Sequence, residues 1–397
     1  MSSFWIYIGL LMLALNAAWW VVALRLTKGK PWHMLVSVFM AGQLAAHLAA
    51  MAGVDLCPIP KAVIVPIIIW HRMGLIFALA ILLVIGIVRA RAWMVRRNHP
   101  VPTPASAHSQ TRREFIGTCA AVAPALFTIG LTGVGLAQLR HFRVRRFTLS
   151  VPALPCGLDG ITIAHVSDMH VGTLTRGRVL REMVNTTNAL RADLVLLTGD
   201  LIHYHLTDLS EALATVKAME GRYGLWMIEG NHDLFDDGAE FARRVKAKGV
   251  PLLLDESAVA NVRGYPVQFF GLRWMGQAKW GDQELGDQEL DRITAMQMRG
   301  LMKHRQPDAF PILLAHHPHA FDAAVKADLP LTLAGHTHGG QMMLNRQYGT
   351  GPVLFRYWSG LYTRGRSQMI VSNGVGNMFP VRINAPAEIV HITLRCA

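Results

Sequence analysis

Long apolar runs separated by short polar segments make up the first third of the chain. Three of them, at residues 4–24, 34–54 and 63–88, are each about long enough to cross a hydrocarbon core of roughly 30 Å. Their apolar residues occupy every face of a helix, which disfavours buried helices of a soluble domain. A fourth run, at residues 115–136, reaches the same length but contains several glycines and Pro124. The pattern predicts a bundle of four membrane-spanning helices.

Beyond residue 140 the pattern changes to short, strand-like apolar runs that alternate with helical stretches. The strand-like runs read ITIAHVSD, LVLLTGD, LWMIEGN, FPILLAH and LTLAGH. Residues 176–190 and 208–219 have helical spacing, and Asp208 and Glu211 are spaced as a capping box for the second helix. Strands that alternate with helices predict an α/β domain with a mostly parallel core.

These patterns divide the chain into four parts. Residues 1–95 are expected to form three transmembrane helices, residues 112–140 the fourth, and residues 141–397 the α/β domain. Residues 96–111 are expected to be a flexible linker, because NHPVPTPASAHSQ has Pro, Ser and Ala without an apolar period. The repeat GDQELGDQEL, at residues 281–290, is expected to be an acidic loop running into a helix. A lid over the functional site is the alternative for this repeat.

Polar side chains with metal-binding chemistry follow the strand-like runs. Ligands of an open α/β sheet bind beyond the carboxyl ends of the strands, so these side chains are expected to lie together. They are Asp168, His170, Asp200, Asn231, His316, His336 and His338. A set of nitrogen and oxygen donors without a thiolate suits two divalent transition-metal ions that share a carboxylate.

The motifs DxH, GD, GNHD, a lone His and GHxH, in this order, resemble those of the calcineurin-like metallophosphoesterases. The resemblance covers roughly residues 143–397. GHTHGGQ, YWSGLYTRG and VSNGVGNMFPVRINAPAEIVHITL are similar to the membrane-associated or exported branch of that family. The resemblance implies two packed sheets flanked by helices. It also implies hydrolysis of a phosphomonoester, phosphodiester or pyrophosphate bond by a hydroxide that bridges two divalent metal ions, expected to be Mn, Zn or Fe.

The family pattern also implies a role for each residue. One metal would be bound by Asp168, His170, Asp200 and His338. Asp200 would bridge to a second metal that is also bound by Asn231, His316 and His336. His232 would stay free of metal and protonate the leaving oxygen. Asp233 would orient its loop or His232, with an ordinary turn role as the alternative. His317 remains an alternative ligand to His316, which is the first residue past its apolar run.

Composition and charge support a membrane protein. Of 397 residues, 52% are hydrophobic and only 16% are charged. Basic residues follow the first apolar run and lie between the third and fourth: Arg25, Lys28, Lys30, Arg89, Arg91, Arg96, Arg97, Arg112 and Arg113. The positive-inside rule places both groups in the cytoplasm and the α/β domain outside the inner or plasma membrane. These flanks explain much of the net charge of +13, which argues against nucleic acid as a partner. The expected partners are the bilayer and a phosphorylated lipid or cell-envelope substrate.

Several alternatives stay open. Residues 111–116, TRREFI, resemble a twin-arginine export signal, but basic residues that stop a membrane helix would look the same. The domain could instead face the cytoplasm as a pyrophosphatase of a nucleotide-linked lipid precursor. It could also be a non-catalytic metal-binding domain.

Two sets of residues have roles that the pattern does not decide. His47, His71 and Arg72 lie inside apolar runs, where ionisable groups are costly, and either function or packing within the bundle accounts for them. Cys156 and Cys396 flank the α/β domain, so a disulfide between them is an alternative to the free thiols that we expect.

Overall fold

A computed structural model of the chain describes residues 3–52, 60–98, 107–139, 142–274, 287–345 and 347–397. The chain divides into two compact units, Met1–Leu136 and Ala137–Ala397. The boundary falls at the end of the fourth apolar run.

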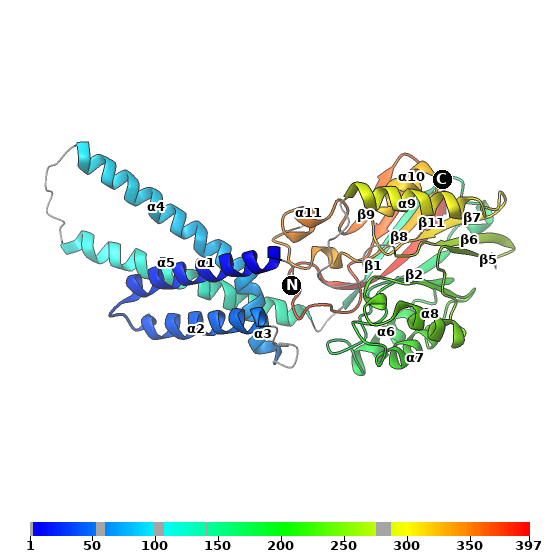
Figure 1. The fold of residues 1–397 in the computed structure, drawn as a ribbon. Helices are drawn as coiled ribbons and strands as arrows, with labels where there is room; N and C mark the ends of the chain where they lie inside the picture. Colours follow the sequence, from blue (N-terminus) through cyan, green and yellow to red (C-terminus); the bar gives the residue numbers. More distant parts are fainter. Residues whose placement is uncertain (1–2, 53–59, 99–106, 140–141, 275–286, 346) are drawn as a thin grey trace. The chain divides into compact units, whose positions relative to one another are not determined.

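The first unit is helical (Figure 1). Its helices are α1 (Ser3–Thr27), α2 (Trp32–Met51), α3 (Lys61–Ile69), α4 (Leu75–Asn98) and α5 (Ala107–Gln138). Four helical stretches among the described residues are long and apolar enough to cross a membrane: Tyr7–Thr27, Trp32–Met51, Leu75–Val95 and Glu114–Gln138. The prediction of an N-terminal bundle with four apolar helices is thus confirmed.

The third apolar run differs from the single helix that was predicted. A π-helical turn, Trp70–Gly74, separates α3 from α4, and the candidate span starts only at Leu75. Pro66 lies inside α3 and cannot donate a backbone hydrogen bond, so the regular helical pattern is already broken one turn earlier.

Helices α4 and α5 extend into the segment expected to be a linker. Helix α4 continues to Asn98 and α5 begins at Ala107, whereas the linker was expected over residues 96–111. Residues 99–106 lie outside the described part. The TRREFI segment lies on α5, where Glu114 forms an ion pair with Lys30 at 2.9 Å.

Three polar side chains inside the helical unit, Trp70, His47 and His71, have hydrogen-bond partners within it. The buried Trp70 donates from Nε1 to Asn16 Oδ1 at 2.7 Å. The rings of His47 and His71 stack with centroids 5.2 Å apart, and each ring shares a hydrogen bond with a helix carbonyl. Packing within the bundle therefore accounts for the position of both histidines.

The second unit contains two sheets. The first has the strand order β1-β11-β2-β3-β4, and the second β5-β6-β7-β8-β10-β9. The bounds of the first are β1 (Phe142–Val151), β2 (Thr162–Val166), β3 (Leu194–Thr198), β4 (Leu225–Ile228) and β11 (Ala387–Cys396). Those of the second are β5 (Glu256–Val262), β6 (Tyr265–Gly271), β7 (Phe310–Leu314), β8 (Leu331–Ala334), β9 (Gly360–Arg364) and β10 (Ser367–Val371). Most neighbouring strands are parallel, as predicted.

Helices cover the outer faces of the two sheets (Figure 1). They are α6 (Arg178–Ala189), α7 (Leu209–Lys217), α8 (Gly238–Ala247), α9 (Asp287–Met302), α10 (Ala320–Lys326) and the short α11 (Thr350–Leu354). One apolar cluster joins the facing sides of the sheets, including Ile163 and Leu194 from the first and Phe269 and Ile312 from the second. Two further clusters lie under α6–α8 and under α9 and α10. The predicted two packed sheets flanked by helices are confirmed.

One local prediction is wrong, and the segment of another is described only in part. The capping box at Asp208 and Glu211 is wrong: the Asp208 carboxylate pairs with Arg176, and Glu211 accepts the backbone N–H of Gly177 at 3.2 Å. The Asp208 side chain binds the guanidinium of Arg176 and makes no hydrogen bond to the first turn of the helix. Of the GDQELGDQEL repeat, residues 287–290 begin α9, and residues 281–286 lie outside the described part.

Candidate metal centre

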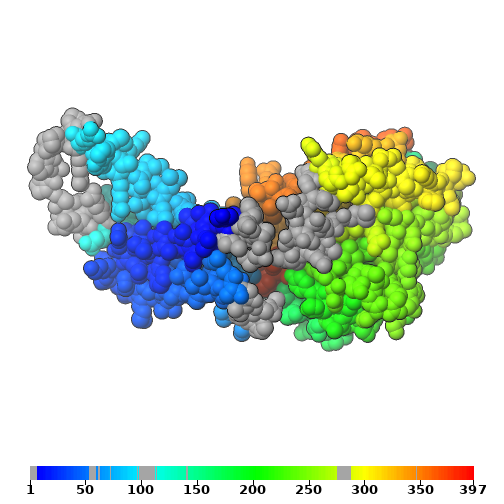
Figure 2. Space-filling model, viewed as in Figure 1, coloured from blue at the N-terminus to red at the C-terminus, as the bar shows by residue number. Residues whose placement is uncertain are grey.

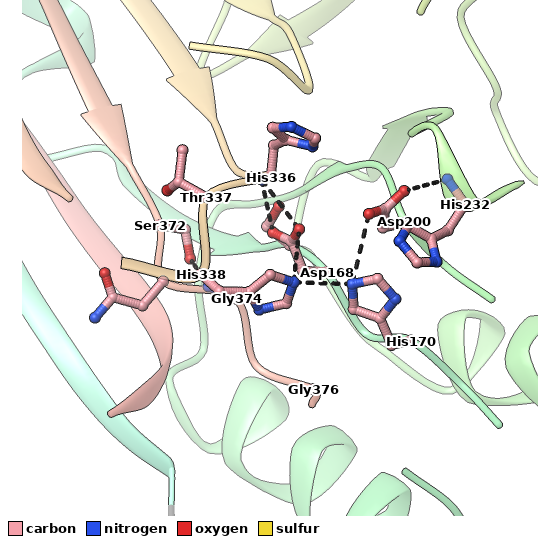
Figure 3. Close-up of polar contacts among 12 residues, drawn as sticks. Asp168, His170, Asp200, His232, His336, Thr337, His338, Ser372, Gly374 and Gly376 are labelled. Atoms are coloured by element: carbon pink, nitrogen blue, oxygen red, sulfur yellow. Dashed lines mark hydrogen bonds and ion pairs between the residues drawn. The ribbon is translucent and has the colours of Figure 1, made fainter. Parts of the chain in front are cut away.

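The predicted ligands converge where strands of both sheets end. Asp168, Asp200 and Asn231 follow β2, β3 and β4 of the first sheet, and His316 and His336 follow β7 and β8 of the second. Figure 3 shows the side chains of Asp168, His170, Asp200 and His338 directed toward one another, while His336 reaches Asp168 through its backbone N–H. The centre therefore lies beyond the carboxyl ends of strands from both sheets.

The first group of donor atoms comes from Asp168, His170 and His338, and these atoms lie within 4.8 Å of one another. His170 Nε2 is 2.9 Å from His338 Nε2, and His338 Nε2 is 3.6 Å from Asp168 Oδ1. His170 Nε2 is also 3.5 Å from Asp200 Oδ2. Two imidazole nitrogens and two carboxylate oxygens thus surround one point.

The second group contains Asp200, His316 and His336, again within 4.8 Å. His316 Nε2 lies 3.2 Å from Asp200 Oδ2 and 3.2 Å from Asn231 Oδ1. His336 Nδ1 lies 3.0 Å from the same Asn231 oxygen. Asp200 Oδ2 is a member of the second group and also lies 3.5 Å from His170 Nε2 of the first, so this carboxylate stands between the two groups.

The local backbone is held in an unfavourable conformation at the ligands. Five of them have a positive φ: Asp168 (54°), His170 (43°), Asp200 (53°), His336 (70°) and His338 (49°). A left-handed conformation of a non-glycine residue is costly and is typically retained at functional sites. The fold therefore holds these side chains in position against their local preference.

Glycines allow the ligand loops to approach closely. A Cβ on Gly335 would lie 1.9 Å from Ser167 Oγ and 2.4 Å from Asp168 Oδ2. A Cβ on Gly230 would lie 2.2 Å from Asp200 Oδ1. Any side chain at these positions would displace a carboxylate of the centre, so glycine is required there.

The electrostatics of the site call for bound cations. Burial raises the pKa of Asp168 to about 6, an effect that His316 opposes and Asp200 reinforces. Burial also disfavours the charge on His316, but the Asp200 carboxylate outweighs it and raises the pKa of His316 to about 9. Positive charge between two buried carboxylates offsets their mutual repulsion and the cost of their burial. The donor set fits two divalent ions, with the amide oxygen of Asn231 as a neutral ligand.

His232 lies beside the two groups. Its backbone N–H donates to Asp200 Oδ1 at 2.8 Å, and its Nδ1 donates to the carbonyl of His203 at 2.6 Å. A carbonyl oxygen only accepts hydrogen bonds, so Nδ1 of His232 carries a proton. Nε2 is then the nitrogen that can exchange a proton with a substrate. This arrangement suits the general-acid role that was expected of His232.

Asp233 accepts hydrogen bonds from two backbone N–H groups. Its Oδ1 accepts from the N–H of Ile202 at 3.0 Å, and its Oδ2 from the N–H of Gly230 at 2.9 Å. Burial, together with the charge of Asp200, raises the pKa of this carboxyl well above its ordinary value. Of the expected roles, the structure favours ordering of the loop, which makes Asp233 a positioning residue.

The structure favours His316 over His317 as a ligand. His316 Nδ1 donates to the Thr198 carbonyl at 2.6 Å, which directs Nε2 toward Asp200. His317 Nδ1 instead accepts the backbone N–H of His319 at 3.1 Å. A small pocket beside His316 and His317 is lined by Trp274, whose ring centroid is 5.1 Å from that of His336.

Two residues at the site were missed by the sequence analysis. His203 Nδ1 lies 3.4 Å from His170 Nδ1. A hydrogen bond between these two nitrogens leaves His170 Nε2 available to bind a cation. Arg382, fully buried, donates from Nη2 to His338 Nδ1 at 3.0 Å. Arg382 lies within the segment VSNGVGNMFPVRINAPAEIVHITL that carries the resemblance, whereas His203 lies three residues past Asp200, outside the motifs.

Comparison with known proteins agrees with this geometry. The sequence model of the calcineurin-like phosphoesterase family matches residues 161–340, which include all the predicted metal ligands, His232 and Asp233. Metallophosphoesterase YkuE of Bacillus subtilis is 28% identical over 302 residues, which are 72% of this chain and 98% of that protein. Among solved structures, phosphopantetheinyl hydrolase PptH of Mycobacterium tuberculosis covers 56% of this chain and 91% of its own at 10% identity, with a TM-score of 0.34. That similarity is too distant to carry a functional conclusion.

Relatives with membrane helices also match. The transmembrane protein with metallophosphoesterase domain of Bos taurus is 29% identical over 63% of this chain, and that of Danio rerio is 27% identical over 63%. The chain spans little more than half the length of these two relatives, 57% and 56%. Residues 161–340 thus form a calcineurin-like phosphoesterase domain, which follows four helices long and apolar enough to cross a membrane, and the matches support a metal-dependent phosphoric ester hydrolase.

Proposed function

We propose that the protein hydrolyses a phosphomonoester, phosphodiester or pyrophosphate bond of a lipid-linked or cell-envelope substrate, with two divalent cations of Mn, Zn or Fe. The observation that supports this proposal is the sharing of Asp200 Oδ2 between two groups of donor atoms at 3.5 Å and 3.2 Å. When bound there, two cations supply a water molecule of lowered pKa and neutralise the charge of the phosphoryl oxygens.

The side chains of the chain perform the remaining steps. Asp200 fixes the separation of the two groups through Oδ2 and holds the loop of His232 through Oδ1. As an imidazolium, His232 gives the proton of Nε2 to the leaving oxygen, while Nδ1 keeps its proton and donates to the His203 carbonyl. Asp233 keeps this loop in place through two backbone N–H groups.

Tethering to a membrane supports a substrate in or near the bilayer. Four apolar helices precede the domain in the same chain, so the local concentration of lipid substrates is high. The distribution of basic residues supports an extracytoplasmic domain at the inner or plasma membrane, and TRREFI supports twin-arginine export. Alkaline phosphatase and green fluorescent protein fused after Ala397 test the orientation. Activity of the first fusion and darkness of the second are expected; the reverse result places the domain in the cytoplasm.

The activity is tested with the full chain in lipid nanodiscs. Protein stripped with a chelator and reloaded with Mn, Zn or Fe is assayed on bis-p-nitrophenyl phosphate, on phospholipids and on DNA. We expect metal-dependent turnover of the small ester and of at least one lipid, and little turnover of DNA. Tight binding of two metals without turnover of any phosphoester would identify a non-catalytic binding domain.

A further inference from the structure

The loop that follows the metal centre carries an exposed apolar surface. Its residues are Leu344, Tyr348, Val353 and Leu354, which are 63%, 64%, 81% and 62% exposed. Among the described residues of the second unit, the other large apolar side chains with high exposure are Val259, Tyr265, Met296 and Leu361. Half of the exposed apolar side chains thus lie in one stretch of eleven residues. Figure 2 shows this segment, drawn in orange, at the surface of the molecule.

The 344–354 surface is joined to the loop that carries two predicted ligands. The hydroxyl of Thr350 donates to the carbonyl of Gly340, and the backbone N–H of Thr350 donates to that of Met342 at 3.1 Å. Just past α11, the ring of Phe355 packs edge-on against His336 with centroids 5.9 Å apart. A molecule that rests on this surface therefore lies beside the metal centre.

The same surface is joined to the end of the fourth candidate span. That span is Glu114–Gln138, and Gln138 Oε1 accepts the backbone N–H of Asn384 at 3.0 Å. The side chain of Asn384 donates in turn to the carbonyls of Met343 and Leu344, at 2.9 Å and 3.1 Å. One residue thus links the last residue of the span to the first residue of the surface. Gln138 is the last residue of the candidate span and belongs to the same compact unit as Asn384 and Leu344.

The composition of the surface suits a lipid interface. The described residues of this stretch, 344–345 and 347–354, include no acidic residue. Apolar side chains with a tyrosine are typical of segments that rest in the head-group region, and acidic side chains would be repelled by anionic lipids. A contiguous exposed apolar surface on a folded domain commonly marks an interaction site.

We propose that the 344–354 surface rests in the interfacial layer of the bilayer and admits a membrane lipid whose phosphate reaches the metal centre while its acyl chains stay in the membrane. The substrate class is then an amphiphilic lipid phosphate, and this assignment of substrate rests on the proposed phosphoesterase function. The contact with lipid does not rest on it, because it follows from the exposed side chains and from the Gln138–Asn384–Leu344 connection.

The lipid contact is tested by photo-crosslinking. A diazirine side chain replaces Val353 in the full chain, which is reconstituted in vesicles of phosphatidylethanolamine and phosphatidylglycerol. The matched control carries the same group at Val259 on β5, another exposed apolar position. Adducts with lipid at position 353, several-fold above those at position 259, are expected. Reaction with water alone, or crosslinks to a second copy of the chain, would overturn the proposal.

The substrate assignment is tested by a ratio of activities. Turnover of phosphatidic acid in the same vesicles is divided by turnover of bis-p-nitrophenyl phosphate for Val353→Asp, Leu354→Asp and the control Val259→Asp. The ratio should fall about tenfold in the first two variants relative to the control, because a charge at these positions disfavours contact with the lipid. An equal ratio in all three variants refutes delivery from the bilayer. Absence of any turnover refutes the phosphoesterase function but leaves the crosslinking result standing.

Discussion

Arg382 orients the imidazole of His338 through a hydrogen bond. Its Nη2 donates to His338 Nδ1 at 3.0 Å, and its remaining N–H groups donate to the Asn377 side chain and to backbone carbonyls of residues 373–385. The guanidinium is fully buried, and burial lowers its pKa to about 10. One side chain therefore fixes both the orientation of a predicted ligand and the loop beneath it.

Replacement of Arg382 should weaken metal binding at the first group of ligands. Arg382→Met removes the donor to His338 Nδ1 and leaves several buried carbonyls without a partner. Loss of such a supporting contact typically lowers metal affinity or activity by about 10- to 100-fold. Metal content measured by mass spectrometry and turnover of bis-p-nitrophenyl phosphate check this expectation. Arg395→Met, at an exposed arginine paired with Asp159, is the matched control. Equal metal content in both variants would exclude the supporting role of Arg382.

The sequence predicts donor atoms better than their supporting contacts. Asp168, Asp200 and His316 each follow an apolar strand directly, and strand ends of a mostly parallel sheet meet in space, so local patterns were sufficient. Arg382 is 44 residues from His338, and no local pattern connects the two. The capping box failed for the same reason: Arg176, 32 residues away, takes the Asp208 carboxylate.

His232 should matter most for substrates with a poor leaving group. Its Nε2 is the nitrogen left to protonate the leaving oxygen, since Nδ1 donates to the His203 carbonyl. His232→Ala should slow hydrolysis of an alkyl phosphodiester by about a hundredfold to ten-thousandfold. Hydrolysis of bis-p-nitrophenyl phosphate should slow much less, because p-nitrophenolate departs without a proton. Rates with both esters and the metal content of the variant are the measurements.

Metal content of His232→Ala should equal that of the unmodified chain. Asp200→Ala should lose metal and nearly all activity, because Asp200 Oδ2 lies within 3.5 Å of a donor nitrogen in each group. Equal slowing of the two esters in His232→Ala would show that His232 positions the substrate and does not act as an acid.

His165 should make the fold sensitive to mild acid. It is fully buried on β2, where Nε2 donates to Thr198 Oγ1 at 2.8 Å, and burial lowers its pKa from 6.5 to about 3. In the unfolded chain the imidazole takes up a proton below its ordinary pKa, so unfolding binds a proton between these two values. Stability is therefore unaffected above pH 6.5 and falls by about 1.4 kcal/mol per pH unit below it.

The measurement is the unfolding temperature between pH 7.5 and pH 5 for the unmodified chain and for His165→Gln, which keeps a donor but does not titrate. The decrease with falling pH should be smaller in the variant. Parallel curves would show that His165 is not buried as a neutral imidazole.

Cys156 and Cys396 should form a disulfide when an external disulfide is supplied. Their sulfur atoms lie 2.9 Å apart, at the start of the short helix Cys156–Leu158 and at the end of β11. Exchange with oxidised glutathione would join the two sulfurs and release two glutathione thiols, and Cys119, which is exposed on α5, serves as the unpaired reference. The closed loop spans 240 residues and ties the C-terminal strand to the sheet, which should stabilise the domain by about 2 to 4 kcal/mol. Peptide mapping without reductant should show the linked pair, and the unfolding temperature should drop on reduction in the natural chain but not in Cys396→Ser. Continued alkylation of both cysteines after oxidation would contradict the pairing and favour the free thiols that the sequence suggested.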